Sequence, residues 1–208
     1  MRHIYIIGSK GIPANYGGFE TFVEQLTAGR QSEEIVYHVA CMDEKAEVVR
    51  YNGAECFHLA VPSIGPAKAV YYDLKAIAWC LHDIRKNNIK DAVVYVLACR
   101  IGPFIGTWKK RLAACGAKLY VNPDGHEWKR AKWNYLIRKY WKFSLCFLLR
   151  AKIKNAKRRG RKIFLPVVKI HDYPDIHTRA VMFPSGLSST PGSPETIQTF
   201  KKYIRAFA

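Results

Sequence analysis

Short apolar runs alternate with polar segments that contain glycine or proline along the first 121 residues. The runs have the length and β-branched or aromatic content of buried strands. They span residues 3–7, 34–41, 54–61, 91–99 and 118–121. Between them, apolar residues recur at helical spacing from 19 to 26, from about 67 to 86, and from 108 to 115. Strands that alternate with helices predict an α/β fold, a Rossmann-like doubly wound parallel sheet.

Two smaller features complete this pattern. Residues 43–51 are polar and are expected only to connect two strands, and Asn52-Gly53 marks a turn. His38 and His58 fall within predicted strands. We therefore expect both histidines to be satisfied core or edge residues, not metal ligands.

A glycine-rich loop, residues 8–18, joins the first predicted strand to the first helix. Glycines let a backbone approach a ligand closely, and the N–H groups of a first helical turn attract an anion. The loop therefore suggests a phosphate or pyrophosphate site at Gly17 and Gly18. The alternative is an ordinary flexible first loop of an α/β domain. The spacing fits neither G-x-G-x-x-G nor G-x-x-x-x-G-K-[ST].

Two more loops, residues 100–106 and 122–127, follow predicted strands. Open α/β sheets bind ligands at the carboxyl ends of their strands, so we expect all three loops to converge on one cleft. Arg100 is the best basic candidate for a phosphate there, because a guanidinium donates two parallel hydrogen bonds. A structural salt bridge is the alternative role for Arg100.

The chain of 208 residues carries a formal net charge of +18, spread unevenly. Residues 145–208 hold 13 Lys and Arg against 3 Asp and Glu, which is more than half of the excess. Candidate partners for such a charge are an anionic membrane, nucleic acid or a phosphorylated substrate. No apolar run reaches the roughly 18–20 residues that span a bilayer, and the N-terminus has no signal-peptide pattern. We therefore expect a cytoplasmic protein with reduced cysteines.

A basic and aromatic helix is predicted from residue 128 to residue 150. One face of it holds Trp133, Leu136, Ile137, Tyr140, Trp141, Ser144, Phe147 and Leu148. Such a helix can rest on an anionic leaflet. The membrane-facing residues would then be Lys129, Lys132, Trp133, Lys139 and Lys142. The alternative is a helix that packs on the core and whose lysines are merely solvated.

Three stretches together resemble a known family: GSKGIPANYGGFETFVEQL, ACRIGPFIG and VNPDGHEWKRAKW. They are similar to the N-terminal half of bacterial rhamnosyltransferases that build cell-wall and capsular polysaccharides. These are retaining glycosyltransferases of the GT-B architecture, in which two Rossmann-like domains face a cleft. The resemblance runs from Met1 to about Ser144. It implies that residues 1–144 form the acceptor-side, N-terminal domain.

The resemblance also implies a reaction and its partners. A sugar, rhamnose from dTDP-rhamnose, would be transferred to a lipid-linked saccharide by an enzyme peripheral on the inner face of the plasma membrane. No metal or other cofactor is expected, in keeping with the absence of a D-x-D dyad from the sequence. Main-chain N–H groups can hold a diphosphate without a metal.

Site residues follow from the same resemblance. Gly17 and Gly18 would approach the donor diphosphate, and Arg100 is added to them as the basic candidate already named for its own chemistry. Glu20 would orient sugar hydroxyls and is grouped with Asn122 in sugar and acceptor binding, although an acidic residue in a first helical turn also offsets the helix dipole. The expected catalytic group follows the fifth strand. It consists of His126, which would contact the donor sugar near the reacting carbon, and of Asp124 and Glu127, which would bind acceptor hydroxyls.

After residue 144 the resemblance ends. The family pattern continues into a donor-binding domain with a Glu-x7-Glu pair, whereas Glu195 is the one glutamate of residues 145–208. This basic, proline-containing tail is expected to have low order. We expect it to come from a shifted reading frame or a recombined gene end, which would leave a truncated chain that is inactive alone.

The alternative is a non-catalytic basic module that binds nucleic acid or anionic membrane. Arg158, Arg159 and Arg161 would then contact the nucleic acid. Nothing in the sequence places them on a folded nucleic-acid-binding motif, so a nucleic-acid partner ranks below a saccharide acceptor.

Overall fold

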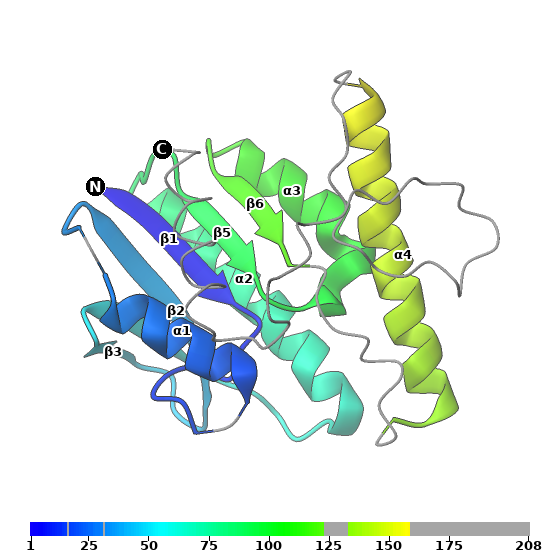
Figure 1. Cartoon of the computed structure of the whole chain (residues 1–208), viewed down its shortest axis with the longest axis horizontal. Coiled ribbons are helices and arrows are strands. Elements are labelled where there is room, and N and C mark those ends of the chain that lie inside the picture. The colour runs from blue at the N-terminus through cyan, green and yellow to red at the C-terminus, as the bar shows by residue number, and fades with distance from the viewer. Residues whose placement is uncertain (16, 31, 123–132, 159–208) are drawn as a thin grey trace, which may run out of the picture.

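The computed structural model describes residues 1–15, 17–30, 32–122 and 133–158, with the backbone alone for 149–158. Within these residues lies a six-stranded sheet in the order β3-β4-β2-β1-β5-β6 (Figure 1). The strands are β1 (Arg2–Ile7), β2 (Ile35–Asp43), β3 (Val48–Tyr51), β4 (Ala54–Ala60), β5 (Val93–Val96) and β6 (Lys118–Val121). Every neighbouring pair is parallel except β3 with β4. The predicted α/β, Rossmann-like fold is confirmed.

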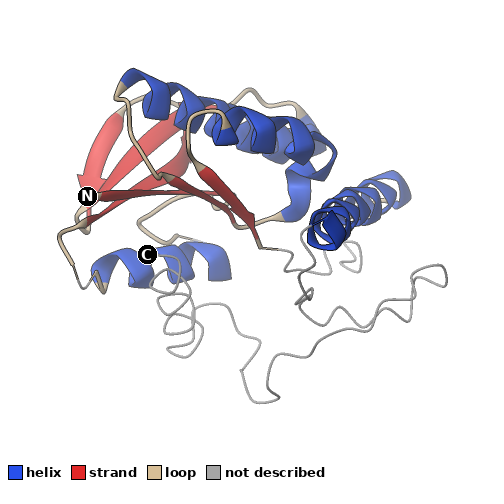
Figure 2. Ribbon diagram, turned by 90° about the horizontal axis from the view of Figure 1, so that it is seen from above, coloured by secondary structure: helices blue, strands red, loops and turns tan. Residues whose placement is uncertain are grey.

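Helices cover both faces of this sheet (Figure 2). Helix α1 (Gly18–Ala28) packs on one face, and α2 (Lys68–Lys86) and α3 (Ile105–Ala113) pack on the other. Two short 3-10 segments precede helices of the second face, η1 (Gly65–Ala67) and η2 (Cys99–Phe104). Helix α4 (Tyr135–Arg158) packs against η2 beyond the β6 edge.

Strand β1 lies between the two halves of the core. Ile4 and Ile6 point toward α1, whereas Tyr5 and Ile7 point toward α2. All four side chains are fully buried. A strand that is covered on both faces needs apolar residues at every position, which explains why its sequence shows no alternation. The wound sheet thus fixes the end of β1, from which the glycine-rich loop departs.

Two strands differ from the sequence prediction. Residues 48–51 form β3, an edge strand joined to β4 through a tight turn at Asn52 and Gly53, both with positive φ. The prediction of a mere connection was wrong because Val48 and Val49 are exposed, so the strand leaves no apolar pattern. Strand β5 ends at Val96, earlier than predicted, because Cys99 already begins η2.

Helix α4 also differs in detail. Its buried side consists of Trp141, Ser144, Leu145 and Leu148. This side is rotated from the predicted face, so Leu136 and Phe147 are exposed. Residue 144, where the first predicted domain ends, lies within α4, and residues 159–208 lie outside the described part of the chain, so the division into domains stays a prediction. No helix among the described residues is long and apolar enough to cross a membrane.

Candidate functional site

Of the three loops predicted to share a cleft, the first two meet at the carboxyl edge of the sheet, and the third is described only at Asn122. Arg100 Nη2 donates a hydrogen bond to the carbonyl of Gly8 over 3.2 Å. The thiol of Cys99 lies 3.3 Å from the carbonyl oxygen of Asn122, and the amide of Asn122 donates to the carbonyl of Val96 over 2.8 Å. The contact of the first two loops agrees with the convergence predicted from strand order, and the shared cleft with residues 123–127 stays a prediction.

The glycine-rich loop folds back over the end of β2. Lys10 accepts a hydrogen bond from the amide of Met42 over 2.9 Å. At Gly11, with φ +110, an added Cβ would lie 2.7 Å from the Cα of Cys41. Glycine is needed there both for the backbone conformation and for the close approach of two chain segments. The loop is thus pinned to the sheet rather than free above it.

Two carboxylates of α1 hold the same loop from the other side. Glu20 Oε1 accepts the amide of Lys10 over 2.7 Å. Glu24 Oε1 accepts the amide of Ala14 over 3.3 Å and the hydroxyl of Tyr51 over 2.8 Å. Glu20 is buried. Its carboxylate therefore has a loop-positioning role, and its predicted contact with sugar hydroxyls stays a prediction.

Helix α1 begins directly after Gly17, which has φ +96 and ψ 163. No side chain in the described residues caps this helix. The second carboxylate oxygen of Glu20 lies beside the turn, since a Cβ on Gly17 would be 2.7 Å from Oε2. The predicted anion site at Gly17 and Gly18 is thus a helix N-terminus that a carboxylate already faces.

Arg100 forms the salt bridge that the sequence left open as its alternative role. Its Nη1 lies 3.1 and 3.2 Å from the two carboxylate oxygens of Asp73 on α2. Asp73 is fully buried, and burial raises the pKa of its carboxyl to about 6, although Arg100 opposes the shift. Because the same guanidinium also holds Gly8, Arg100 ties α2 to the start of the glycine-rich loop. Its contact with a phosphate stays a prediction.

Helix α4 closes the other side of the η2 turn. The hydroxyl of Ser144 donates to the carbonyl of Cys99 and accepts the amide of Gly102 over 2.9 Å. The hydroxyl of Tyr140 donates to the carbonyl of Arg100 over 2.6 Å. A Cβ on Gly102 would lie 2.0 Å from the backbone oxygen of Ser144. The segment that carries Arg100 is therefore fixed by α4.

Sequence reasoning did not identify Asp73, Tyr140 or Ser144 as site-supporting residues. Asp73 lies among apolar residues on a helix, where an acidic residue gives no signal of burial. Tyr140 and Ser144 fell on the predicted apolar face of their helix, where they gave no signal of hydrogen bonding to a loop. A buried hydroxyl usually finds a partner, and that was the one available signal.

Several predicted site residues fall outside the described part of the chain: Asp124, His126, Glu127, Lys129 and Lys132. Of the remaining predicted residues on α4 and just before it, Trp133 is half-buried against Trp141, with ring centroids 6.4 Å apart. Lys139 is exposed with its ammonium 4.5 Å from the ring centroid of Tyr135, and Lys142 is half-buried.

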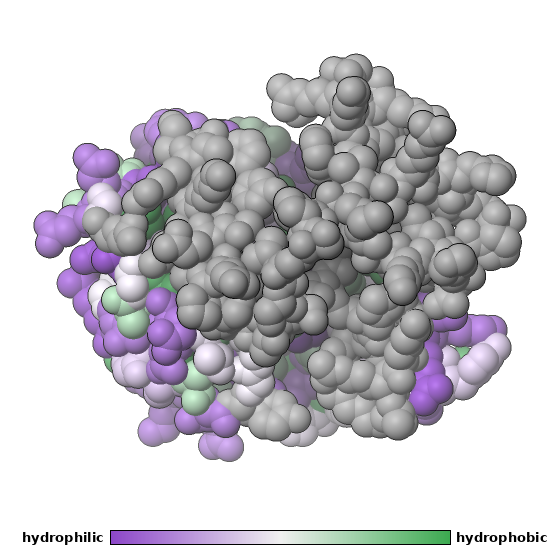
Figure 3. Space-filling view, viewed as in Figure 1, coloured by the Kyte–Doolittle hydropathy of each residue, from purple (hydrophilic) through white to green (hydrophobic). Residues whose placement is uncertain are grey.

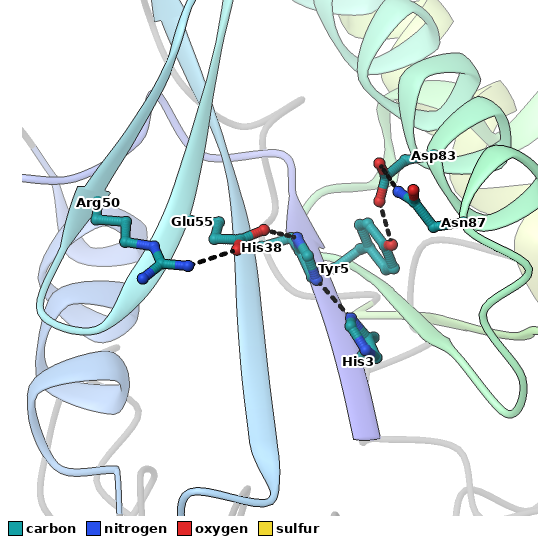
Figure 4. Close-up of polar contacts among 7 residues, drawn as sticks. All are labelled: His3, Tyr5, His38, Arg50, Glu55, Asp83 and Asn87. Atoms are coloured by element: carbon teal, nitrogen blue, oxygen red, sulfur yellow. Dashed lines mark hydrogen bonds and ion pairs between the residues drawn. The ribbon is translucent and has the colours of Figure 1, made fainter. Parts of the chain in front are cut away.

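A second polar cluster lies toward the amino ends of the strands (Figure 4). His3 Nδ1 lies 2.8 Å from Nε2 of His38, whose Nδ1 lies 3.1 Å from Glu55 Oε2. The ring of Tyr5 stacks on His38, and its hydroxyl donates to Asp83 over 2.6 Å. Burial lowers the pKa of both histidines.

His38 and His58, the two strand histidines considered in the sequence, both contact polar side chains. His58, on β4, lies 2.9 Å from Asp43 through Nδ1. Among the described residues, no three His, Cys, Asp or Glu side chains form a group that could hold a metal ion. The amino-end cluster is separated from the glycine-rich loop by the length of β1, so it is not part of the carboxyl-edge site.

Comparison with known proteins gives one family and one distant structure. A sequence model described as "Domain of unknown function (DUF1972)" matches residues 1–156. A solved structure described as trehalose-6-phosphate from E. coli bound with UDP-2-fluoro glucose matches with a TM-score of 0.31 and 15% identity. That match covers 53% of this chain and 30% of the other. No curated protein matches the sequence.

Proposed function

The chain belongs to the family described as Domain of unknown function (DUF1972), and we propose that it is the N-terminal domain of a GT-B glycosyltransferase. It would transfer a sugar from a nucleotide-sugar to a lipid-linked saccharide in cell-wall or capsular polysaccharide synthesis. The donor we propose is dTDP-rhamnose, and the place is the inner face of the plasma membrane. This proposal rests on the resemblance to rhamnosyltransferases and on the arrangement of the carboxyl-edge loops.

The observation that carries the proposal is the uncapped N-terminus of α1 beside a pinned glycine-rich loop. No described side chain caps the first turn of the helix after Gly17, although the Glu20 carboxylate lies beside it, and Arg100 binds Gly8 at the other end of the same loop. Main-chain N–H groups at a helix N-terminus attract a diphosphate without a metal. In this proposal Gly17 and Gly18 approach the donor diphosphate, while Arg100 keeps the loop in place and adds positive charge.

The remaining roles concern the sugar and the acceptor. Glu20 would accept hydrogen bonds from sugar hydroxyls. Asn122, which follows β6, would also contact the sugar or the acceptor. His126 would donate a hydrogen bond near the reacting carbon, and Asp124 and Glu127 would bind acceptor hydroxyls.

The test is binding of the donor to the chain as it is. A ligand that binds only the folded state stabilises it by about 2.7 kcal/mol at a hundred times its dissociation constant. We expect dTDP-rhamnose to raise the melting temperature of the wild type. In the Gly17→Ala variant the same ligand should have little effect, because a methyl group would occupy the anion site and the φ of +96 would be strained.

A matched control separates loss of the site from loss of stability. Gly53 also has positive φ, +69, but lies in the turn between β3 and β4, and a Cβ there meets nothing closer than 3.6 Å. Gly53→Ala should therefore lower stability while keeping the response to the donor. If dTDP-rhamnose stabilises neither the wild type nor this control, the donor assignment is wrong. DNA binding with a steep salt dependence would then favour the basic-module alternative.

A further inference from the structure

Helix α4 has two unlike sides. One side packs on η2 and the core, whereas the other exposes four large side chains: Tyr135 (67% exposed), Leu136 (73%), Phe143 (53%) and Phe147 (40%). Leu136, Phe143 and Phe147 follow one another at spacings of two turns and one turn, so they form a continuous stripe. The rings of Phe143 and Phe147 meet edge to face with centroids 4.9 Å apart. We call Tyr135, Leu136, Phe143 and Phe147 the outer stripe.

The charge of the same helix is entirely positive. Residues 135–158 contain eight Lys and Arg and no Asp or Glu. Beside the outer stripe, Lys139 is exposed, and its ammonium lies over the Tyr135 ring. At the amino-terminal end of α4, Figure 3 shows mostly hydrophilic residues with a small hydrophobic area between them. An exposed apolar stripe on a helix without acidic residues is complementary to a surface that is both apolar and anionic.

We propose that the outer stripe of α4 lies in the headgroup region of an anionic lipid bilayer, with the helix parallel to the membrane plane. The helix is not apolar enough to span a bilayer. A helix with basic residues around an apolar face instead binds at the interface, where Leu and Phe reach the acyl boundary and lysines extend to the headgroups. This partner surface differs from the one expected from sequence, because Trp133 packs inward against Trp141.

Two other occupants fit less well. Nucleic acid would satisfy the positive charge, but its phosphate backbone would give Leu136 and Phe147 no apolar surface on which to pack. A second copy of α4 would cover the stripe, but it would bring eight positive charges against eight others. An anionic bilayer satisfies both the apolar and the charged parts. The inference rests on the proposed function only for the lipid-linked acceptor that would make membrane docking useful.

The test is co-sedimentation of the full chain with vesicles, without any nucleotide-sugar. One set contains phosphatidylcholine alone, and the other adds about one third phosphatidylglycerol. We expect binding to the anionic vesicles to be about tenfold tighter at roughly 100 mM salt. The double variant Leu136→Ser/Phe143→Ser should bind the anionic vesicles about tenfold more weakly than the wild type.

The matched control is Val48→Ser/Val49→Ser, which removes two exposed apolar side chains from β3, at the opposite edge of the sheet. This control should bind vesicles as the wild type does, and circular dichroism should show that both double variants are folded. Wild-type binding by the stripe variant would overturn the proposal, because the basic tail would then account for all the attraction. Binding to duplex DNA without binding to vesicles would overturn it as well.

Failure of the membrane proposal is distinguishable from failure of the donor proposal. Vesicle binding that depends on the outer stripe, with no stabilisation by dTDP-rhamnose, would leave the membrane surface in place and remove the donor assignment. Stabilisation by dTDP-rhamnose with no vesicle binding would support the donor assignment and overturn the membrane proposal.

Discussion

Two glycine-containing corners at the carboxyl edge of the sheet look alike in sequence and differ in structure. The first, after β1, ends at Gly17 and Gly18, and the second, after β5, contains Gly102. Gly17 has φ +96 and precedes a helix that no described side chain caps. Gly102 has no positive φ, yet a Cβ on it would collide with the backbone of Ser144. Glycine is needed at position 17 for its positive φ, whereas at position 102 it is needed because α4 packs too closely for a Cβ.

The difference makes the first corner the better candidate for a ligand site. At the second corner α4 occupies the backbone groups, since Tyr140 and Ser144 bind the carbonyls of Arg100 and Cys99 and the amide of Gly102. At the first corner the loop is held from below by Glu20 and Glu24, and no described side chain caps the N-terminus of α1. One corner is therefore structural support, and the other is the candidate binding site.

Gly102→Ala is expected to have the largest effect, and it tests whether α4 packs tightly on the second corner. Its methyl group would lie 2.0 Å from a backbone oxygen that cannot rotate away, so α4 must shift. Overpacking of this kind costs typically 1–3 kcal/mol, and with a backbone neighbour we expect about 3 kcal/mol. The measurement is the free energy of unfolding from urea titration, followed by the fluorescence of Trp141, which is buried in this contact region.

Gly106→Ala is the matched control for that variant. Gly106 lies in α3, a few residues further on, and a Cβ there meets nothing within 4 Å. Alanine should raise stability by about 0.5–1 kcal/mol because it is the better helix former. Equal effects of the two substitutions would show that α4 does not pack tightly on η2.

The next test concerns the pair of Asp73 and Arg100, which supports the start of the glycine-rich loop. The pKa of Asp73 is raised to about 6 by burial, so between about pH 4 and pH 6 the folded state binds a proton that the unfolded state has released. The contribution of Asp73 to stability is therefore greatest below pH 4 and is lost as the pH rises to about 6. The Tyr140 hydroxyl stays neutral across this window, because burial raises the pKa of Tyr140.

Asp73→Asn removes this titration. The free energy of unfolding of the variant, relative to wild type, should therefore increase by about 2–3 kcal/mol between pH 4 and pH 6.5. Urea titrations of both proteins across this range give the difference directly. A difference that stays constant with pH would mean that Arg100 keeps Asp73 ionised throughout, with no raised pKa.

The main features of the fold were predictable because the core is patterned on local rules. Apolar runs such as Ile4–Ile7 predict a buried strand, and Asn52-Gly53 predicts a tight turn. The glycine-rich corner was also identifiable, because its glycines lie between a strand and a helix. The residues that hold the glycine-rich corner in place could not be predicted from the sequence. The pairing of Asp73 with Arg100 and the docking of Ser144 on Gly102 join residues 27 and 42 positions apart, and no local pattern encodes such contacts.

Ser144→Ala tests the polar part of the α4 contact alone. The hydroxyl both donates to Cys99 and accepts from Gly102, so its removal leaves a buried amide and a buried carbonyl without this partner. An unsatisfied buried group costs about 1–3 kcal/mol, and we expect a loss of about 2 kcal/mol in urea titration. Cys146→Ala, at a half-buried position on the same helix, should cost less. A smaller loss for Ser144→Ala than for this control would mean that shape alone holds α4.

The smallest effect on stability, and the sharpest on the first corner, is expected for Glu20→Gln. Glutamine can still accept the Lys10 amide through its carbonyl oxygen, so the free energy of unfolding should fall by less than about 1 kcal/mol. The loss of negative charge beside Gly17 should strengthen binding of dTDP severalfold, since a carboxylate there repels a phosphate at the helix N-terminus.

The Glu20→Gln substitution should change the affinities for dTDP and for dTDP-rhamnose differently. If Glu20 also accepts hydrogen bonds from sugar hydroxyls, dTDP-rhamnose should gain less affinity than dTDP, or lose some. Isothermal titration with both ligands gives the ratio, and Glu24→Gln is the control because its carboxylate binds Ala14 and Tyr51 instead. An equal gain for both ligands would leave Glu20 as a loop-positioning residue that does not contact the sugar. No gain for dTDP would place the diphosphate away from Gly17 and return the first corner to a structural role like that of the second.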